Sequence, residues 1–222
     1  LVREYAANQS EPAFETLVSR HVSLVHSAAL RQVRDPGLAE ELTQTLAQNS
    51  IKNIVSCCPH CTTMLDKDYR QIRAYAELGV RVVHHSELIE ELIPKLSLSP
   101  SPEPVTYHDP CYLARGRGIT EAPRQILESC GASVLEPEHH GQGTYCCGAG
   151  GAQLFITDDR REASTQRVNQ KRFAQLSETK ASTIAVACPY CPIMLRDAAG
   201  HAKRDDIAIR DLAEIVASPL GT

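Results

Sequence analysis

The segment TIAVACPYC, which runs from Thr183 to Cys191, carries the clearest structural signal in the chain. Its first five residues are β-branched or small, and this composition predicts a short buried strand. The next four place two cysteines three positions apart around a proline, and a helical pattern over 192–199 follows. A strand that ends in cysteine and leads into a helix indicates an α/β fold with reactive side chains at the carboxyl end of a strand.

A second copy of this pattern lies nearer the amino terminus. The stretch IVSCCPHC at residues 54–61 has the same order of apolar strand, cysteine, proline and final cysteine. A Met-Leu pair follows each copy, at Met64 and at Met194. The repetition indicates the end of one repeat unit and the end of a second.

Short β-branched runs alternate with helical stretches from about residue 45 onward. The expected strands are 53–56, 80–84, 105–108, 133–135 and 183–187, and the expected helices are 62–78, 86–96, 122–130, 160–175 and 192–199. This alternation predicts an α/β fold in which helices flank one or more parallel sheets, with cysteines at the carboxyl ends of strands. The segment 97–104 is rich in proline and serine and predicts a linker.

The first 44 residues follow a different pattern. Apolar residues recur at steps of three and four over 10–34, and Asp35-Pro36 restarts the pattern in a second helix. We expect an N-terminal helical hairpin that forms its own segment, 1–44.

The composition is that of an ordinary globular protein of 222 residues, 42% hydrophobic and 23% charged. A net charge of −4 gives no reason to expect nucleic acid as a partner. No apolar run approaches the roughly 18 residues of a membrane helix, and no leader pattern is visible. We expect a soluble, cytoplasmic chain that meets a membrane only through a partner. Because it begins at Leu1, we also expect a fragment.

Nine cysteines in a chain without a secretory signal are expected to be reduced thiols with a metal or redox role. The predicted cofactor and metal ligands are Cys111, Cys146, Cys147, Cys188 and Cys191. Five thiolates are one more than a tetrahedral zinc site uses, and an adjacent pair suits a cluster in which each sulfur binds a different iron. A zinc site and a dithiol redox switch stay open as alternatives.

Other residues are weaker candidates. Cys58 and Cys61 belong either to a partial metal site or to the buried structural thiols. Roles other than ligation are expected for the rest. The pairs His84-His85 and His139-His140 are expected to be solvated or hydrogen-bonded, and His108-Asp109 to support the ligands from behind or to form a turn. Arg115 and Arg124 are expected either to balance the charge of the site or to lie on the surface, and Cys130 is expected to pack in the core.

Three motifs in this order carry a family resemblance: YHDPCYL at 107–113, CCGAGG at 146–151 and CPYC at 188–191. Over about residues 45–200 the chain resembles the cysteine-rich CCG domain of heterodisulfide reductase and of glycolate oxidase iron–sulfur subunits. The resemblance implies tandem CCG units, each with a 4Fe–4S-type cluster, in an electron-transfer oxidoreductase. It also implies redox partner proteins, either a flavoprotein or another iron–sulfur subunit.

The first of these units departs from the family pattern. The resemblance implies an earlier cysteine and a cysteine pair ahead of Cys58 and Cys61, and neither is found upstream of Cys57. We therefore expect 45–96 to be the end of a first unit and 105–222 a complete second unit. Electron transfer through this chain alone is then expected to be incomplete.

Residues 14–44 resemble another family, the start of region 2 of an extracytoplasmic-function sigma factor. That resemblance implies contact with RNA polymerase, but the match stops near Gln44, so we expect a gene fusion or an artefact. Two alternatives to an iron–sulfur oxidoreductase stay open. One is a non-catalytic, zinc-binding or metal-free interaction module, and the other is a regulator that binds RNA polymerase.

Overall fold

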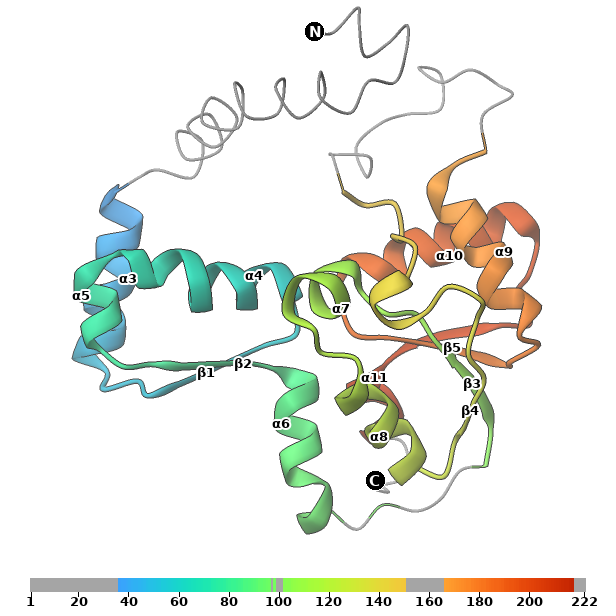
Figure 1. The fold of residues 1–222 in the computed structure, drawn as a ribbon, viewed down its shortest axis with the longest axis horizontal. Coiled ribbons are helices and arrows are strands. Elements are labelled where there is room, and N and C mark those ends of the chain that lie inside the picture. The colour runs from blue at the N-terminus through green and yellow to red at the C-terminus, as the bar shows by residue number, and fades with distance from the viewer. Residues whose placement is uncertain (1–35, 97, 99–101, 151–165, 218–222) are drawn as a thin grey trace, which may run out of the picture. The chain divides into compact units, whose positions relative to one another are not determined.

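The computed structural model describes residues 36–96, 98, 102–150 and 166–217 (Figure 1). The chain divides into two compact units, 1–52 and 53–222. In the first unit, helix α3 (Pro36–Gln48) confirms the helix expected to restart at Asp35-Pro36. The other helix of the expected hairpin, over 10–34, lies outside the described residues. The boundaries expected at residue 44 and at the linker stay predictions.

The second unit contains a four-stranded parallel sheet in the order β4-β3-β5-β6. Its strands are β3 (Pro104–Tyr107), β4 (Ser133–Val134), β5 (Thr183–Val186) and β6 (Ala208–Asp211). All four residues of β5 are buried. A central strand covered on both faces needs apolar residues at successive positions, which explains the composition of the stretch that begins at Thr183.

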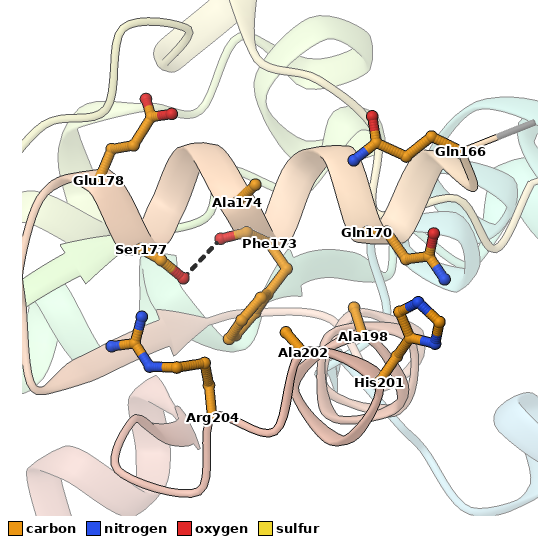
Figure 2. Close-up of a pocket in the computed structure, with 10 residues that line it drawn as sticks. All are labelled: Gln166, Gln170, Phe173, Ala174, Ser177, Glu178, Ala198, His201, Ala202 and Arg204. Atoms are coloured by element: carbon orange, nitrogen blue, oxygen red, sulfur yellow. Dashed lines mark hydrogen bonds between the residues drawn. The ribbon is translucent and has the colours of Figure 1, made fainter.

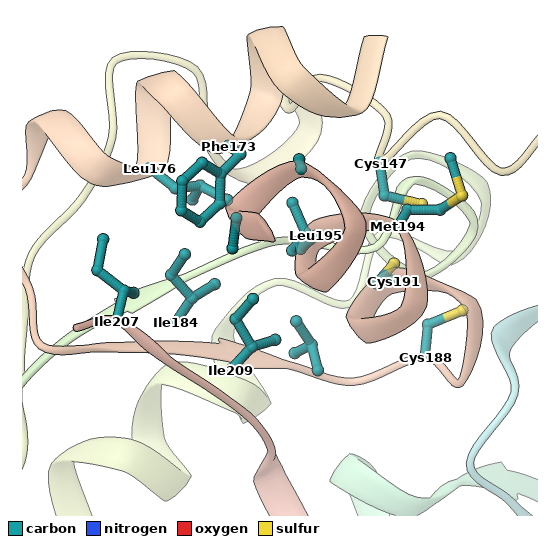
Figure 3. Close-up of a cluster of buried hydrophobic side chains, with 13 residues drawn as sticks. Cys147, Phe173, Leu176, Ile184, Cys188, Cys191, Met194, Leu195, Ile207 and Ile209 are labelled. Atoms are coloured by element: carbon teal, nitrogen blue, oxygen red, sulfur yellow. The ribbon is translucent and has the colours of Figure 1, made fainter. Parts of the chain in front are cut away.

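Helices cover both faces of this sheet (Figure 1). On one face lie α9 (Val168–Glu178) and α10 (Tyr190–Ala202), and on the other lie α8 (Glu121–Ser129) and α11 (Leu212–Ala217). Two further helices are α6 (His85–Leu92), which packs against α8 and α11, and α7 (Cys111–Arg117), which follows β3. Ile184 packs into a core with α9 and α10 (Figure 3), whereas Ala185 packs into a second core with α8 and α11. The alternation of β5 side chains therefore joins the two helical layers through one strand.

A two-stranded parallel sheet precedes the larger one. It pairs β1 (Asn53–Ser56) with β2 (Arg81–His84), with Ile54 opposite Val82. The prediction of a single helix over 62–78 was wrong. The connection consists of α4 (Pro59–Thr63), a π-helical turn η1 (Met64–Asp68), a 3₁₀ turn η2 (Tyr69–Gln71) and α5 (Arg73–Glu77). Ile72 has an extended backbone, with φ −84° and ψ 111°, and this break ends the helical run.

Among the α-helices and strands of the described residues, β6, α7 and α11 were not expected from the sequence, and neither was the 3₁₀ turn η4 (Gly141–Gly143). Glycines in and just after α7, at Gly116 and Gly118, hide its helical pattern, and Gly118 ends it with φ +71°. The ends of two other helices differ from those expected. Helix α6 ends at Leu92 and continues as a 3₁₀ turn η3 (Ile93–Lys95), and α10 begins at Tyr190. The part of the expected helix 160–175 that lies before 166 is outside the described residues.

Candidate metal centre

The carboxyl ends of β3 and β5 bring three of the candidate cysteines to one edge of the sheet. The two strands are parallel neighbours, so the residues that follow them meet at the same edge. Cys111 is the first residue of α7, Cys188 is the second residue after β5, and Cys191 lies in the first turn of α10. Figure 3 shows Cys188 and Cys191 near Cys147, at one end of the hydrophobic core.

The cysteine pair lies on a loop that packs against this edge. The Thr144 hydroxyl donates to the carbonyl oxygen of Asp109 at 3.2 Å, and the Gly148 amide donates to Cys146 Sγ at 3.3 Å. Gly148 has φ +91°, and a Cβ atom there would lie 3.1 Å from the Asn169 amide nitrogen. A glycine is therefore needed for the turn that presents the pair.

All of the predicted thiols line one cavity of about 450 Å³. Its cysteines are Cys58, Cys61, Cys111, Cys146, Cys147, Cys188 and Cys191. The sulfur atoms of Cys111 and Cys146 lie 3.8 Å apart. The pair Cys188 and Cys191 is buried, as is Cys147. The structure thus brings together the five predicted ligands and both weaker candidates, while their ligand roles stay predictions.

Because the thiols lie close together, hydrogen bonds between them lower the pKa values of some and raise those of others. The hydrogen bond from Cys111, with others from Cys147 and the Gly148 amide, holds the pKa of Cys146 far below its usual range. A hydrogen bond from Cys191, with a further one from His60, lowers the pKa of Cys188 to about 5 although burial opposes the shift. The pKa of Cys111 is raised because it donates to Cys146 and because it is partly buried. Two of the five sulfurs are therefore stabilised as thiolates, the form that binds metals.

His60 lies over this cavity and was not predicted as a site residue. Its ring packs against that of Tyr112 at a tilt of 32°, with centroids 3.9 Å apart, and meets the Tyr190 ring edge-on at 5.9 Å. A hydrogen bond with Cys188 raises the pKa of His60. The CPHC segment at 58–61 is thereby placed against the CPYC segment at 188–191. The repetition in the sequence could have pointed to this residue, because His60 occupies the position of Tyr190 in the other copy.

Charged residues brace the loop after β3. Asp109 is fully buried and accepts from Arg124 at 2.9 and 3.0 Å and from the Gly141 amide at 2.8 Å. Arg124 also pairs with Glu136 at 2.6 Å. His108 is fully buried, and a ring nitrogen of its imidazole lies within 4.8 Å of the sulfur atoms of Cys147 and Cys191. These residues thus fix the segment after β3 that leads to Cys111.

The other sequence candidates have hydrogen-bonding or packing positions. His84 accepts from the Ser86 amide at the start of α6, and His85 Nε2 lies 3.2 Å from Asp211. Cys130 is buried in the core beside α8, as expected. The remaining candidates are placed as follows: His139 stacks on Tyr145, His140 Nδ1 lies 2.9 Å from the Pro137 carbonyl oxygen, and Arg115 forms a hydrogen bond with Cys111.

A second hollow, of about 530 Å³, lies between α9 and α10 (Figure 2). Its lining combines Phe173 and three alanines with Glu178, His201 and Arg204, and it contains no sulfur donor. It offers none of the thiolates that bind iron–sulfur clusters. The cysteine cavity is therefore the candidate metal centre.

The donor set fits an iron–sulfur cluster better than a single ion. A tetrahedral metal uses four ligands, whereas this cavity offers five buried or half-buried thiols and two more at its side. Adjacent residues such as Cys146 and Cys147 bind different atoms of a cluster more readily than one ion. The concentration of cysteines in the lining and the amide of Gly148 directed at Cys146 are features of protein iron–sulfur sites.

Comparison with known proteins agrees with this geometry. Residues 105–196 match the family model described as "CCG: Cysteine-rich domain". The chain is similar to the "Probable membrane-anchored ferredoxin" of Chromohalobacter salexigens, with 36% identity over 82% of this chain and 27% of that protein. It is 30% identical to the EtfAB:quinone oxidoreductase of Syntrophomonas wolfei, over 80% of this chain and 26% of that protein.

A third relative is a subunit of the dihydromethanophenazine:CoB–CoM heterodisulfide reductase of Methanosarcina barkeri. It is 30% identical over 83% of this chain and 44% of that protein. The chain therefore spans between about a quarter and less than half of the length of these relatives. Within the described ranges, no helix has the length and apolar character needed to cross a membrane.

Proposed function

We propose that this chain, whose residues 105–196 match the cysteine-rich CCG domain, is the cluster-binding part of an iron–sulfur oxidoreductase. The observation that carries the proposal is the convergence of five cysteines from three distant segments on one cavity. Relatives described as a ferredoxin, a quinone oxidoreductase and a heterodisulfide reductase subunit support electron transfer as the common chemistry.

In this proposal the five cysteines Cys111, Cys146, Cys147, Cys188 and Cys191 hold the cluster. When bound, a 4Fe–4S-type cluster supplies one-electron chemistry. The protein's part is to stabilise Cys146 and Cys188 as thiolates, to supply amide donors such as that of Gly148, and to exclude water by burying Cys147 and Cys191. Cys58 and Cys61 lie at the side of the cavity and remain the weaker candidates.

We propose a redox protein as the partner, either a flavoprotein or another iron–sulfur subunit. Tyr112 and Tyr190 are 46% and 41% exposed beside the cavity, and Ile193 is 49% exposed one turn further along α10. Exposed aromatic and apolar side chains next to a redox centre suit a partner that must approach the centre closely. Polymerase binding depends on residues that lie mostly outside the described ranges, and it stays a prediction.

Anaerobic reconstitution with iron and sulfide tests the proposal. We expect about four irons and about four acid-labile sulfides per chain, with broad visible absorption. The double variant Cys111→Ser, Cys147→Ser is expected to lose both the colour and the paramagnetic signal of the reduced state. Cys57→Ser is the matched control, because Cys57 is exposed and does not line the cavity. Stoichiometric zinc without labile sulfide in the wild-type chain would establish the interaction module instead.

A further inference from the structure

A buried arginine lies directly behind the cysteine cavity. Arg172 of α9 is fully buried, and its Nε–H donates to Nδ1 of His108 at 3.0 Å. Its Nη1 donates to the carbonyl oxygen of His139 at 2.8 Å and to Gln175 at 3.3 Å. These contacts fix the guanidinium group against the imidazole of His108.

This contact decides which nitrogen of His108 carries the proton. Every polar atom of a guanidinium group is a donor, so Nδ1 of His108 must be the acceptor and has no proton of its own. A neutral imidazole then carries its proton on Nε2. Because Nδ1 accepts from a guanidinium group, the ring is not the doubly protonated imidazolium, in which both nitrogens are donors.

Among the described residues the protonated nitrogen has no partner of its own, and two sulfur atoms lie close to the ring. Nε2 of His108 is buried and has no hydrogen-bond partner within the described part of the chain. A ring nitrogen of His108 lies within 4.8 Å of the sulfur atoms of Cys147 and Cys191, and Nδ1 is already bonded to Arg172. A histidine that binds a metal presents a lone pair to the metal and donates from its other nitrogen. His108 has the opposite arrangement, because its other nitrogen accepts.

We propose that His108 is a hydrogen-bond donor to the cluster sulfurs at Cys147 and Cys191, that Arg172 is the positioning residue that sets its tautomer, and that the pair raises the reduction potential of the centre. The inference rests on the proposed iron–sulfur function. Reduction adds one electron, supplied by the partner protein or a chemical reductant, and part of the added charge resides on sulfur. A donor at this place stabilises the reduced state more than the oxidised state, and no proton is transferred.

Redox titration of reconstituted full-length chains tests the role of the donor. His108→Phe keeps a buried ring without a donor, and His108→Gln restores an N–H group. We expect the Phe variant to shift the one-electron equilibrium toward the oxidised form by roughly tenfold, which corresponds to a potential lower by about 59 mV. The Gln variant is expected to recover part of the shift. Equal potentials in the wild type and the Phe variant would overturn the proposal.

Nitrogen NMR of the metal-free, full-length chain tests the tautomer independently of iron. We expect His108 in the wild type to carry its proton on Nε2, and Arg172→Met to lose this preference. A proton on Nδ1 in the wild type, or direct coupling between a His108 nitrogen and iron in the reconstituted protein, would overturn the assignment. Absence of iron uptake by the wild type would overturn the proposed function itself, whereas iron uptake with an unchanged potential would overturn the role of His108 alone.

Discussion

At the scale of single residues, the site depends on a backbone turn as much as on its sulfur atoms. Cys146 and Cys147 face the cavity because Gly148 takes a left-handed conformation directly after them. The same residue donates its amide to Cys146. One glycine therefore places a ligand pair and stabilises negative charge on it.

Gly148→Ala is expected to weaken cluster uptake. The new Cβ would lie 3.1 Å from the Asn169 amide nitrogen and 3.3 Å from the Val168 Cβ, and the left-handed backbone is strained for alanine. We expect a loss of about 1–3 kcal/mol in the free energy of unfolding and less iron retained after gel filtration. Gly150→Ala is the matched control, because a Cβ there meets nothing within 4 Å. Equal iron retention in the two variants would contradict this account.

At the scale of elements, a buried ion pair fixes the corner between β3 and α8. Asp109 follows β3 and accepts from Arg124 of α8 and from the Gly141 amide, and its carbonyl oxygen accepts from Thr144. The corner therefore fixes both the start of α7 at Cys111 and the loop that carries the cysteine pair. Through these hydrogen bonds, Asp109 connects the end of β3, helix α8 and the loop 141–144.

Removing one member of this pair is expected to be costly. Asp109 has no exposed side-chain surface, so Arg124→Leu would leave its charge buried without a positively charged partner. We expect a loss of about 3–5 kcal/mol, measured by urea unfolding of the metal-free chain. Arg204→Leu removes an arginine from an exposed pair with Asp206 and serves as the control, with no measurable change expected. A comparable loss in both variants would show that burial of Asp109 is not the cause.

Sequence patterns predict the elements of the sheet better than the contacts between them. The strands β1, β3 and β5 and the gathering of cysteines at strand ends follow from local apolar runs and from the rule that parallel strands end at one edge. The pairing of Asp109 with Arg124 and of His108 with Arg172 does not, because it depends on packing between residues 15 and 64 positions apart. Strand β6 was missed because polar residues surround a short apolar alternation.

At the scale of the whole unit 53–222, the two copies of the Cys-Pro-X-Cys motif share one cavity. The segment 58–64 forms one wall, and the residues after β3 and β5 form the others. Three contacts join this wall to α7. The His60 ring packs against Tyr112, Asp66 forms an ion pair with Arg117 at 3.2 Å, and Lys67 donates to the Gly116 carbonyl oxygen. The site therefore depends on contacts between the two repeats.

The ion pair between Asp66 and Arg117 is expected to make the contact between the two repeats dependent on pH. Burial acts to raise the pKa of Asp66, but hydrogen bonds from Arg70 and Arg117 outweigh it and lower the pKa below its ordinary value. A carboxylate with a lowered pKa stabilises the folded state above its unfolded pKa, and this contribution is lost as pH falls through the folded pKa. Asp66→Asn should therefore destabilise the chain near neutral pH and have little effect in acid.

Urea unfolding of the metal-free chain at about pH 7 and about pH 3 measures this difference. Asp66 is partly exposed, so solvent screening limits the expected loss at neutral pH to at most about 1 kcal/mol. Glu77→Gln is the control, because its pair with Arg73 is exposed and lies within one helix. Because the wall carries His60, the Asn variant should also expose Cys188 to faster alkylation. A loss that is equal at both pH values would show that the carboxylate charge does not hold the two repeats together.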